Sequence, residues 1–302
     1  MSRVAFLLVP HLHVLDLAGA AQAFSDAADL GLGYELVYLA EAAQVPTAQG
    51  LVLQAGTAWP DLDPDDLLVV PGWRGSLFGR PELIGDRALR LLRDHHAAGG
   101  VVASVCAGAD ALGRAGLLDG RRCTTHHALQ DKLARLYPEA RVVGDVLYVV
   151  DGRVVTSAGI ASGIDMALHL LAVRHGPAVA AKVARSMVVY ARRNGDEPQA
   201  SALLRHRGHL SDSVHRVQDV IDTRYADRLP LSELADLAGV SERTLTRTFS
   251  GATGLTPLRY QQELRVERAE HLIGHGATVE AAARAVGFDD ARMLRRLRSR
   301  RG

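Results

Sequence analysis

Residues 231–249, LSELADLAGVSERTLTRTF, decide the fold of the last third of the chain. The apolar residues of their first half recur at helical spacing and form one stripe: Leu231, Leu234, Ala235 and Ala238. Gly239 permits a sharp turn, and Ser241 can cap the helix that follows. Leu245 and Phe249 then anchor that second helix on one side. The stretch therefore predicts two short helices joined by a tight turn.

The second helix of this pair carries residue types that contact DNA. With its apolar anchors buried, the residues left outside include Arg243, Thr244 and Arg247. A second helix that exposes arginine and threonine is what a helix-turn-helix offers the major groove. We predict that these three side chains contact DNA. The alternative is an ordinary helical hairpin with a solvated charged face.

The same pattern recurs near the end of the chain. A second apolar stripe consists of Val279, Ala282, Ala283 and Val286. Gly287 and Phe288 supply the turn, and Arg292 and Arg296 point outward as further candidates for DNA contact. Residues 256–276 lie between the two copies and have the pattern of one long helix.

Two helix-turn-helix units joined by one long helix resemble the AraC-type DNA-binding domain over residues 211–302. The matching landmarks are Ala235, Gly239, Phe249, Gly254, Pro257, Arg265, Ala269, Gly287 and Phe288. The resemblance implies double-stranded DNA as a partner. Arg298 stands where the family has a large aromatic residue, and the chain stops at Gly302, before the family's last segment. We expect Leu297 to replace the aromatic residue in the core and the second unit to read bases less stringently.

The composition is typical of a soluble protein with two domains. The chain has 302 residues, 48% of them hydrophobic, and a formal net charge of +1, so DNA contact must come from local clusters. No apolar run reaches the roughly eighteen residues of a membrane span. The first residues are typical of a core strand rather than a signal peptide. Two cysteines, Cys106 and Cys123, give no disulfide framework. We expect a cytoplasmic protein without a membrane partner.

Strand and helix patterns alternate over the first two hundred residues. Apolar runs of strand length lie at 4–9, 35–40, 66–72 and 101–106. Helical patterns lie at 15–28, 82–97, 109–118, 162–175 and 177–190. Apolar strands alternating with helices predict a mostly parallel sheet covered on both faces. Residues 146–157 predict a hairpin that turns at Asp151 and Gly152.

Cys106 is the candidate reactive residue of this region. It ends the run VVASVC, and the small residues Ser104 and Gly108 stand two positions to either side, as a nucleophile elbow requires. At a helix N-terminus its thiol should be more acidic than a free thiol, and Cys123 should be less reactive. The alternative is a buried structural cysteine.

Several segments resemble the PfpI/ThiJ-type branch of the class I glutamine amidotransferase-like superfamily: 15–20, 69–73, 103–129, 137–142 and 151–171. Joined to an AraC-type domain, they are similar to a GlxA-family transcriptional regulator. This resemblance implies an α/β flavodoxin-like sandwich, a ligand-sensing or vestigial catalytic pocket, and a homodimer through the N-terminal domain. With the composition shift after residue 190, it predicts a sensor domain at 1–192, a linker at 193–210 and a DNA-binding domain at 211–302.

The resemblance also assigns single residues. Cys106 matches the family's elbow cysteine, and Asp16 matches the acidic residue beside it, although capping a helix is an equal alternative for Asp16. His126 follows a short strand where the superfamily often brings a histidine towards the pocket. The adjacent His127 should point in a different direction. Gly72, Trp73 and Gly159 could line the same pocket, although Trp73 has the alternative of covering apolar surface. No cluster suggests a metal, and no cofactor is expected.

Position 107 separates the possible functions. Proteolytic relatives have histidine after the elbow cysteine and isonitrile hydratase relatives tend to have threonine, whereas this chain has Ala107. Alanine can neither accept a proton nor polarise a substrate, so we expect no enzyme and no catalytic residue. We expect a one-component transcriptional regulator whose pocket binds a small molecule that the sequence does not identify. The alternative is an isonitrile-hydratase-like or amidase-like enzyme that uses Cys106.

Overall fold

The computed structural model describes residues 2–189, 193–199, 205–274 and 276–299. Contacts divide the chain into two compact units, Met1–Gln199 and Ala200–Gly302, which we describe separately. Among the described residues, no helix is both long enough and apolar enough to cross a membrane.

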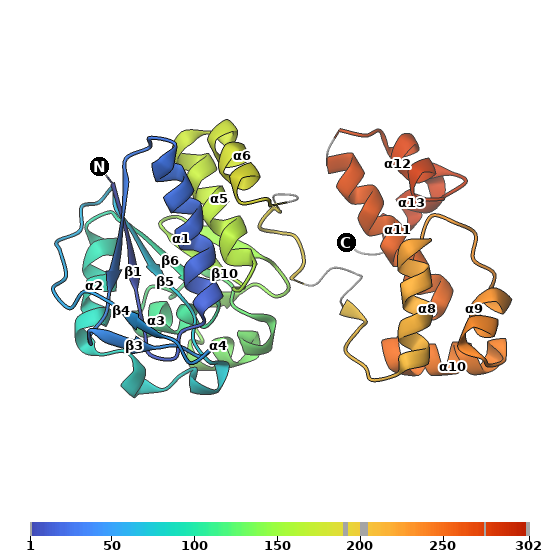
Figure 1. Cartoon of the computed structure of the whole chain (residues 1–302), viewed down its shortest axis with the longest axis horizontal. Coiled ribbons are helices and arrows are strands. Elements are labelled where there is room, and N and C mark those ends of the chain that lie inside the picture. The colour runs from blue at the N-terminus through green and yellow to red at the C-terminus, as the bar shows by residue number, and fades with distance from the viewer. Residues whose placement is uncertain (1, 190–192, 200–204, 275, 300–302) are drawn as a thin grey trace. The chain divides into compact units, whose positions relative to one another are not determined.

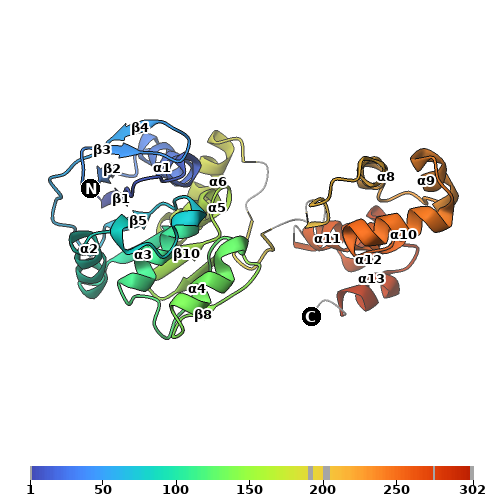
Figure 2. The same cartoon turned by 90° about the horizontal axis from the view of Figure 1, so that it is seen from below.

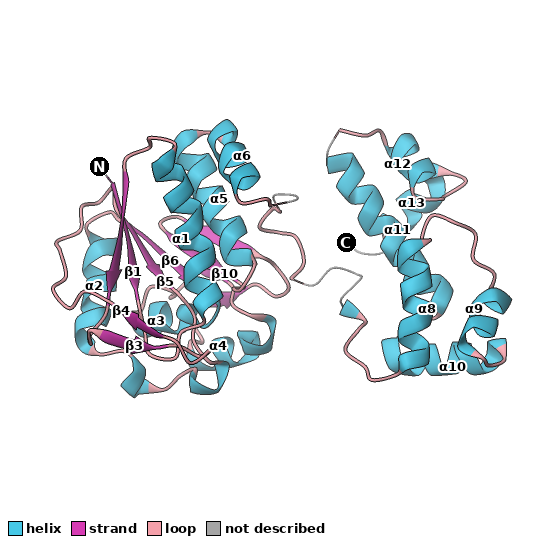
Figure 3. Ribbon diagram, viewed as in Figure 1, coloured by secondary structure: helices cyan, strands magenta, loops and turns pink. Residues whose placement is uncertain are grey.

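A six-stranded sheet forms the centre of the first unit (Figures 1 and 3). Its strands are β1 (Ser2–Leu7), β2 (Tyr34–Leu39), β5 (Leu67–Val70), β6 (Val101–Val105), β9 (Tyr148–Asp151) and β10 (Val154–Ser157). Their order is β2-β1-β5-β6-β10-β9, and all neighbours are parallel except β9 and β10. The parallel part has the strand order of flavodoxin, which confirms the predicted sandwich. The β9–β10 pair confirms the predicted hairpin.

Helices cover both faces of this sheet. The central strands of the sheet carry buried apolar side chains on both faces, which need such a cover. One face carries α1 (Val14–Asp29), α5 (Ser162–His175) and α6 (Pro177–Ser186), and the other carries α2 (Asp86–Ala97) and α3 (Ala109–Arg114) (Figure 2). The remaining elements of the unit are small: α4 (Gln130–Leu136), the hairpin β3 (Gln44–Pro46) and β4 (Val52–Gln54), the pair β7 (Arg122–Cys123) and β8 (Arg141–Val142), and 3₁₀ turns at Gly75–Leu77, Pro81–Leu83, Cys106–Gly108 and His127–Leu129.

Three predicted helices of the first unit are shorter in the structure than in the sequence pattern. The helix expected at 82–97 begins at Asp86, because a separate 3₁₀ turn precedes it. The helix expected at 109–118 ends at Arg114, and Gly116 follows with a left-handed φ of 74°. The helix expected at 177–190 ends at Ser186, and Val188 has a φ of 55°. Residue 190 itself lies outside the described residues.

The second unit is helical throughout its described elements, α8 (Asp212–Thr223), α9 (Leu231–Ala238), α10 (Glu242–Thr253), α11 (Pro257–Gly274), α12 (Val279–Ala285) and α13 (Ala291–Arg298). The pairs α9–α10 and α12–α13 are the two predicted helix-turn-helix units (Figure 1). Gly239 makes the first turn with a φ of 70°, and Ser241 caps α10 by accepting the N–H of Thr244. Asp290 caps α13 in the same way through the N–H of Arg292.

Each helix-turn-helix unit packs its own core against α11. The first core consists of Val214, Val217, Ile221, Leu234, Ala235, Leu245, Phe249, Tyr260 and Leu264. The second consists of Val266, Ala269, Ala282, Ala283, Val286, Phe288 and Leu294. Leu297 packs against the second core, as predicted, while the neighbouring Arg298 forms an ion pair with Glu270 (3.5 Å).

The two ends of the segment 193–210 form hydrogen bonds and ion pairs with different units. Its first residues bond to the first unit, and Arg207 bonds to the second. Arg193 donates to the buried Asp165 from its backbone N–H (3.1 Å) and its guanidinium (2.6 and 3.1 Å). The carbonyl of Gly195 accepts the backbone N–H of Leu147 (2.8 Å). In the second unit, Arg207 forms ion pairs with two aspartates of α8, Asp219 and Asp222 (2.7 and 2.5 Å).

Candidate functional site

Cys106 lies on a tight turn at the carboxyl end of β6. Its φ is 54°, in the left-handed region that non-glycine residues rarely adopt, and a 3₁₀ turn over Cys106–Gly108 leads into α3. A side chain at Gly108 would collide with the backbone of Val70 on the neighbouring strand β5. The small residues around the cysteine therefore make the elbow possible, as the sequence pattern predicts.

Two glycine loops close over this elbow. A side chain at Gly159, which follows β10, would collide with Cys106. A Cβ at Gly72, which follows β5, would lie 2.5 Å from Oδ2 of Asp16 and 2.7 Å from Cβ of Cys106. As a result, Cys106 is only 5% exposed. The site thus gathers at the carboxyl ends of four parallel strands, where α/β sheets bind their ligands.

Asp16 is the acidic residue of the site. It lies in the first turn of α1 and is fully buried. The backbone N–H of Ile160 donates to its Oδ1 (2.6 Å), while Oδ2 faces Gly72 and the cysteine. His13 occupies the N-cap position of α1 and makes no side-chain cap. The helix-capping alternative for Asp16 is therefore wrong, because its carboxyl points away from the helix end and into the site.

Burial controls the ionisation of this pair. It raises the pKa of Asp16, an effect opposed by the N–H of Ile160 and the charge of His13. Burial also raises the pKa of Cys106, as does the adjacent carboxylate, and only the N–H of Ala107 opposes them among the groups that act on this thiol. The predicted acidic thiol is therefore wrong, since a 3₁₀ turn and a six-residue helix offset little of the burial. Burial raises the pKa of Cys123 to about 11.

The segment that follows β7 contacts the elbow through Thr125. The buried hydroxyl of Thr125 donates to the carbonyl oxygen of Cys106 (2.7 Å). His126 is partly buried, and its Nδ1 accepts the N–H of Ala128 (3.3 Å). Its ring centroid lies 4.1 Å from that of His127, so the prediction that the two rings diverge is wrong. Burial lowers the pKa of His126.

Trp73 does not line an open pocket. It is fully buried beside the loop that carries Gly72, and its indole N–H has no partner among the described residues. Within those residues, no cluster of three or more histidine, cysteine or acidic side chains could hold a metal ion.

The first recognition helix, α10, presents the predicted arginines to solvent. Arg243 and Arg247 are exposed one helical turn apart, and neither has an ion pair within the described residues. Thr244 is half-buried, and its N–H and hydroxyl form hydrogen bonds with the hydroxyl of Ser241 (3.3 and 3.0 Å). The two arginines are thus free to contact the edges of DNA bases. The threonine also takes part in capping the N-terminus of α10.

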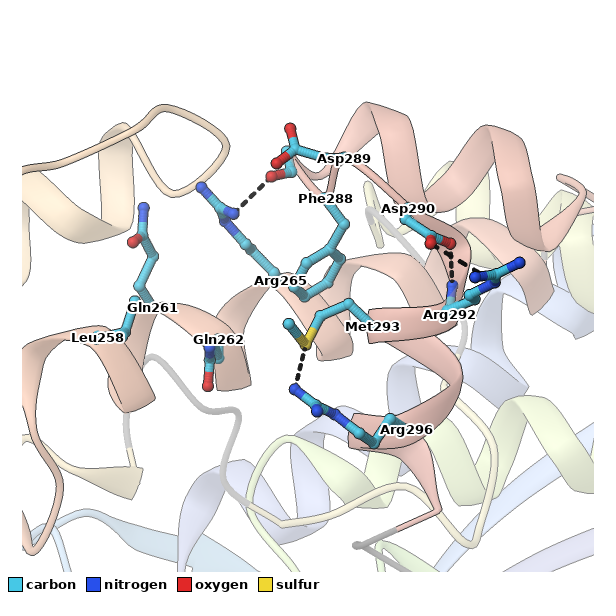
Figure 4. A pocket seen from close by; sticks show the side chains of 11 residues that line it. Leu258, Gln261, Gln262, Arg265, Phe288, Asp289, Asp290, Arg292, Met293 and Arg296 are labelled. Carbon is cyan, nitrogen blue, oxygen red and sulfur yellow. Dashed lines mark hydrogen bonds and ion pairs between the residues drawn. The ribbon is translucent and has the colours of Figure 1, made fainter.

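The second recognition helix, α13, is more engaged with its own domain (Figure 4). Arg292 lies 3.8 Å from Asp290, and a nitrogen of Arg296 lies 3.1 Å from the sulfur of Met293. Both arginines are exposed at the rim of a cavity of about 470 Å³ between α11 and α13. Arg295, on the same helix, forms an ion pair with Glu280, and the sequence pattern gave no sign of it.

Comparisons with known proteins agree with this division of the chain. A family model described as the DJ-1/PfpI family matches residues 2–173, and a helix-turn-helix domain model matches residues 234–301. The HTH-type transcriptional regulator CdhR of Pseudomonas aeruginosa is 29% identical over 290 residues, 94% of this chain and 84% of that protein. An isonitrile hydratase of Pseudomonas putida is 36% identical over 168 residues, 56% of this chain and 70% of the enzyme.

A solved structure is similar to part of the chain. The crystal structure of an AraC family transcriptional regulator from Pseudomonas putida matches at 26% identity with a TM-score of 0.55, covering 62% of this chain and all of that one. The part of the chain with the flavodoxin-like sheet and the cysteine elbow is thus the part that matches the DJ-1/PfpI family model. The part with the paired helix-turn-helix units is the part that matches the helix-turn-helix model. The chain therefore belongs to the DJ-1/PfpI family and joins a domain of that family to an AraC-type helix-turn-helix domain.

Proposed function

We propose that the protein is a transcriptional regulator that binds double-stranded DNA as a homodimer and responds to a small molecule at the Cys106–Asp16 site. DNA contact comes from Arg243, Thr244 and Arg247 on α10, with Arg292 and Arg296 of α13 as the second set. The exposure of the α10 arginines supports this, as do relatives named as transcriptional regulators along almost the whole chain.

One observation supports the proposal that a small molecule at this site controls DNA binding. Gln199 is the last described residue before the DNA-binding unit, and its side chain donates to the carbonyl of Thr125 (3.0 Å) and accepts the N–H of His127 (2.8 Å). The hydroxyl of the same Thr125 holds the carbonyl of Cys106. A ligand that moves the elbow would therefore disturb the attachment of the chain that leads to the DNA-binding unit.

The experiment uses Cys106→Met as a fixed occupant of the site. The full chain first selects a duplex from a random library, and fluorescence anisotropy then measures its affinity at constant salt. We expect Cys106→Met to change this affinity by about fivefold or more, within the usual range of allosteric coupling. The change should vanish in the Gln199→Ala background.

Glu197→Ala is the matched control, because its carboxylate accepts the N–H of Asn194 within the same segment (2.8 Å). It should leave the effect of Cys106→Met in place. Unchanged affinity in Cys106→Met, or an effect that survives in Gln199→Ala, would contradict control through this site.

The same site should have no robust turnover. Ala107 lacks the functional side chain that catalytic relatives have at this position, a contribution typically worth about 10²-fold or more. Purified protein would be assayed with isonitriles and small amides. Turnover above about 1 per second, in the ordinary range of enzymes, that disappears in Cys106→Ser would support the hydratase-like alternative instead.

The homodimer has a candidate surface on the first unit. A groove of about 420 Å³ runs between α1, β2 and β4, and β2 is an edge strand of the sheet. Large apolar side chains remain exposed on these elements or next to them: Leu15, Tyr38, Leu51 and Val52. The outer side of β2 bridges to Gly56 at its end, at Leu39. An apolar patch beside an edge strand favours association, and a second copy would cover it.

A further inference from the structure

The helix α11 carries two separate cores, and Arg265 stands at the boundary between them. Tyr260 and Leu264 belong to the core of the first helix-turn-helix unit. Val266 and Ala269 belong to the core of the second. Apolar packing secures each unit to the helix, and the half-buried Tyr225, just after α8, packs against both cores.

At this boundary, the guanidinium of Arg265 joins the two units by donating hydrogen bonds to backbone carbonyls of both. Its Nε donates to Tyr225 (2.6 Å), and its Nη2 donates to Ala226 and Asp227 (3.2 and 2.8 Å). Its Nη1 donates to Gly287 (2.6 Å). The first three carbonyls lie on the loop that leads into α9, and the fourth lies on the turn that leads into α13.

Neighbouring residues fix the same junction (Figure 4). The amide of Gln261, one turn earlier on α11, donates to the carbonyls of Tyr225 and Asp227 (3.0 and 2.8 Å). Gly287 has a φ of 83°, and any side chain there would collide with the backbone of Ala226. The guanidinium carbon of Arg265 also lies 5.5 Å from the centre of the Phe288 ring.

We infer that Arg265 is a positioning residue for DNA recognition, which sets the spacing and rotation of α13 relative to α10. Arginine suits this role because its planar fork directs several N–H donors at fixed angles, whereas lysine offers a single ammonium. Two recognition helices held rigidly apart bind two half-sites as one event, with the second contact made at no further cost of ordering. A loose junction would keep each contact and lose that linkage.

The test measures how affinity depends on the distance between half-sites. The wild-type chain selects a duplex from a random library, and variants of this duplex carry one to five additional base pairs between the two half-sites. Five base pairs rotate one half-site by about half a turn. Wild-type protein should lose affinity with each insertion. Arg265→Ala should bind the parent duplex about tenfold more weakly, bind a duplex with one half-site scrambled as the wild type does, and tolerate insertions.

Two variants separate positioning from general stability. Arg265→Lys should restore part of the dependence on spacing. Arg207→Ala removes an arginine that pairs with Asp219 and Asp222 of α8 and interacts with Tyr260, all within the first helix-turn-helix unit, so it should lower thermal stability without flattening that dependence.

A wild-type spacing profile in Arg265→Ala would overturn the inference. So would equal losses of affinity on the parent and half-scrambled duplexes. If circular dichroism shows that Arg265→Ala does not fold, Gln261→Ala decides by the same comparison, since it removes two bonds of the same junction.

Discussion

At the scale of single residues, two buried aspartates of the first unit should respond oppositely to the same substitution. Burial raises the pKa of Asp16, so the folded chain holds that proton more tightly than the unfolded chain does. The resulting stability is present below the unfolded pKa of about 3.9 and is lost as the pH rises through the folded value. At neutral pH the carboxyl is ionised in the unfolded chain, so its burial on folding carries a free-energy cost, which Asp16→Asn removes.

Asp16→Asn should raise the melting temperature at pH 7 by roughly 2–4 °C, the shift expected for about 1 kcal/mol, and the gain should shrink in acid. Asp165→Asn is the control and should lower it, because Arg193 donates three hydrogen bonds to that carboxylate. Calorimetry across pH measures both. A destabilised Asp16→Asn at pH 7 would contradict the assigned ionisation cost.

At the scale of elements, α10 should determine sequence preference. Arg243 and Arg247 share one exposed face opposite Leu245 and Phe249, which are buried. An arginine that pairs with guanine through two hydrogen bonds contributes about 1–3 kcal/mol of discrimination. Arg247→Ala should therefore weaken binding to the selected duplex by roughly ten- to hundredfold and relax one base position.

The control is Arg284→Ala, which changes an exposed arginine on α12, the first helix of the other unit. It should weaken all duplexes alike or have no effect. Anisotropy at matched salt compares the selected and scrambled duplexes. If Arg247→Ala leaves their affinity ratio unchanged, α10 does not read bases.

Local patterns predict the elements well, and distant contacts define the site. The run VVASVC with its small neighbours predicts the elbow, because strand, turn and glycine signals all lie within a few residues. Thr125, Ile160 and Gln199 are different, since they act on groups 19, 144 and 74 positions away in the chain. The raised pKa of the Cys106 thiol has the same origin. The segments that bury this thiol follow four different strands, so no short stretch of sequence contains them all.

At the scale of the whole molecule, association should depend on the edge of the first unit. Tyr38 lies on the edge strand β2 and is 36% exposed in the groove beside α1. Tyr38→Glu places a charge there, so it should convert a dimer to a monomer in light scattering and weaken binding to a two-fold symmetric duplex. Leu136→Glu, on α4 and 44% exposed, should leave the dimer intact. A wild-type monomer, or a Tyr38→Glu dimer, would contradict this surface.

The division of α11 between two cores has a consequence for how the helix opens. Its backbone bonds are continuous from Pro257 to Gly274, yet its two halves are protected by different sets of buried side chains. Amide hydrogens near Tyr260 should exchange with solvent when the first core opens, and those near Ala269 when the second does. One uninterrupted helix would then show two exchange rates that change at Arg265, because each half reports the opening of a different neighbour.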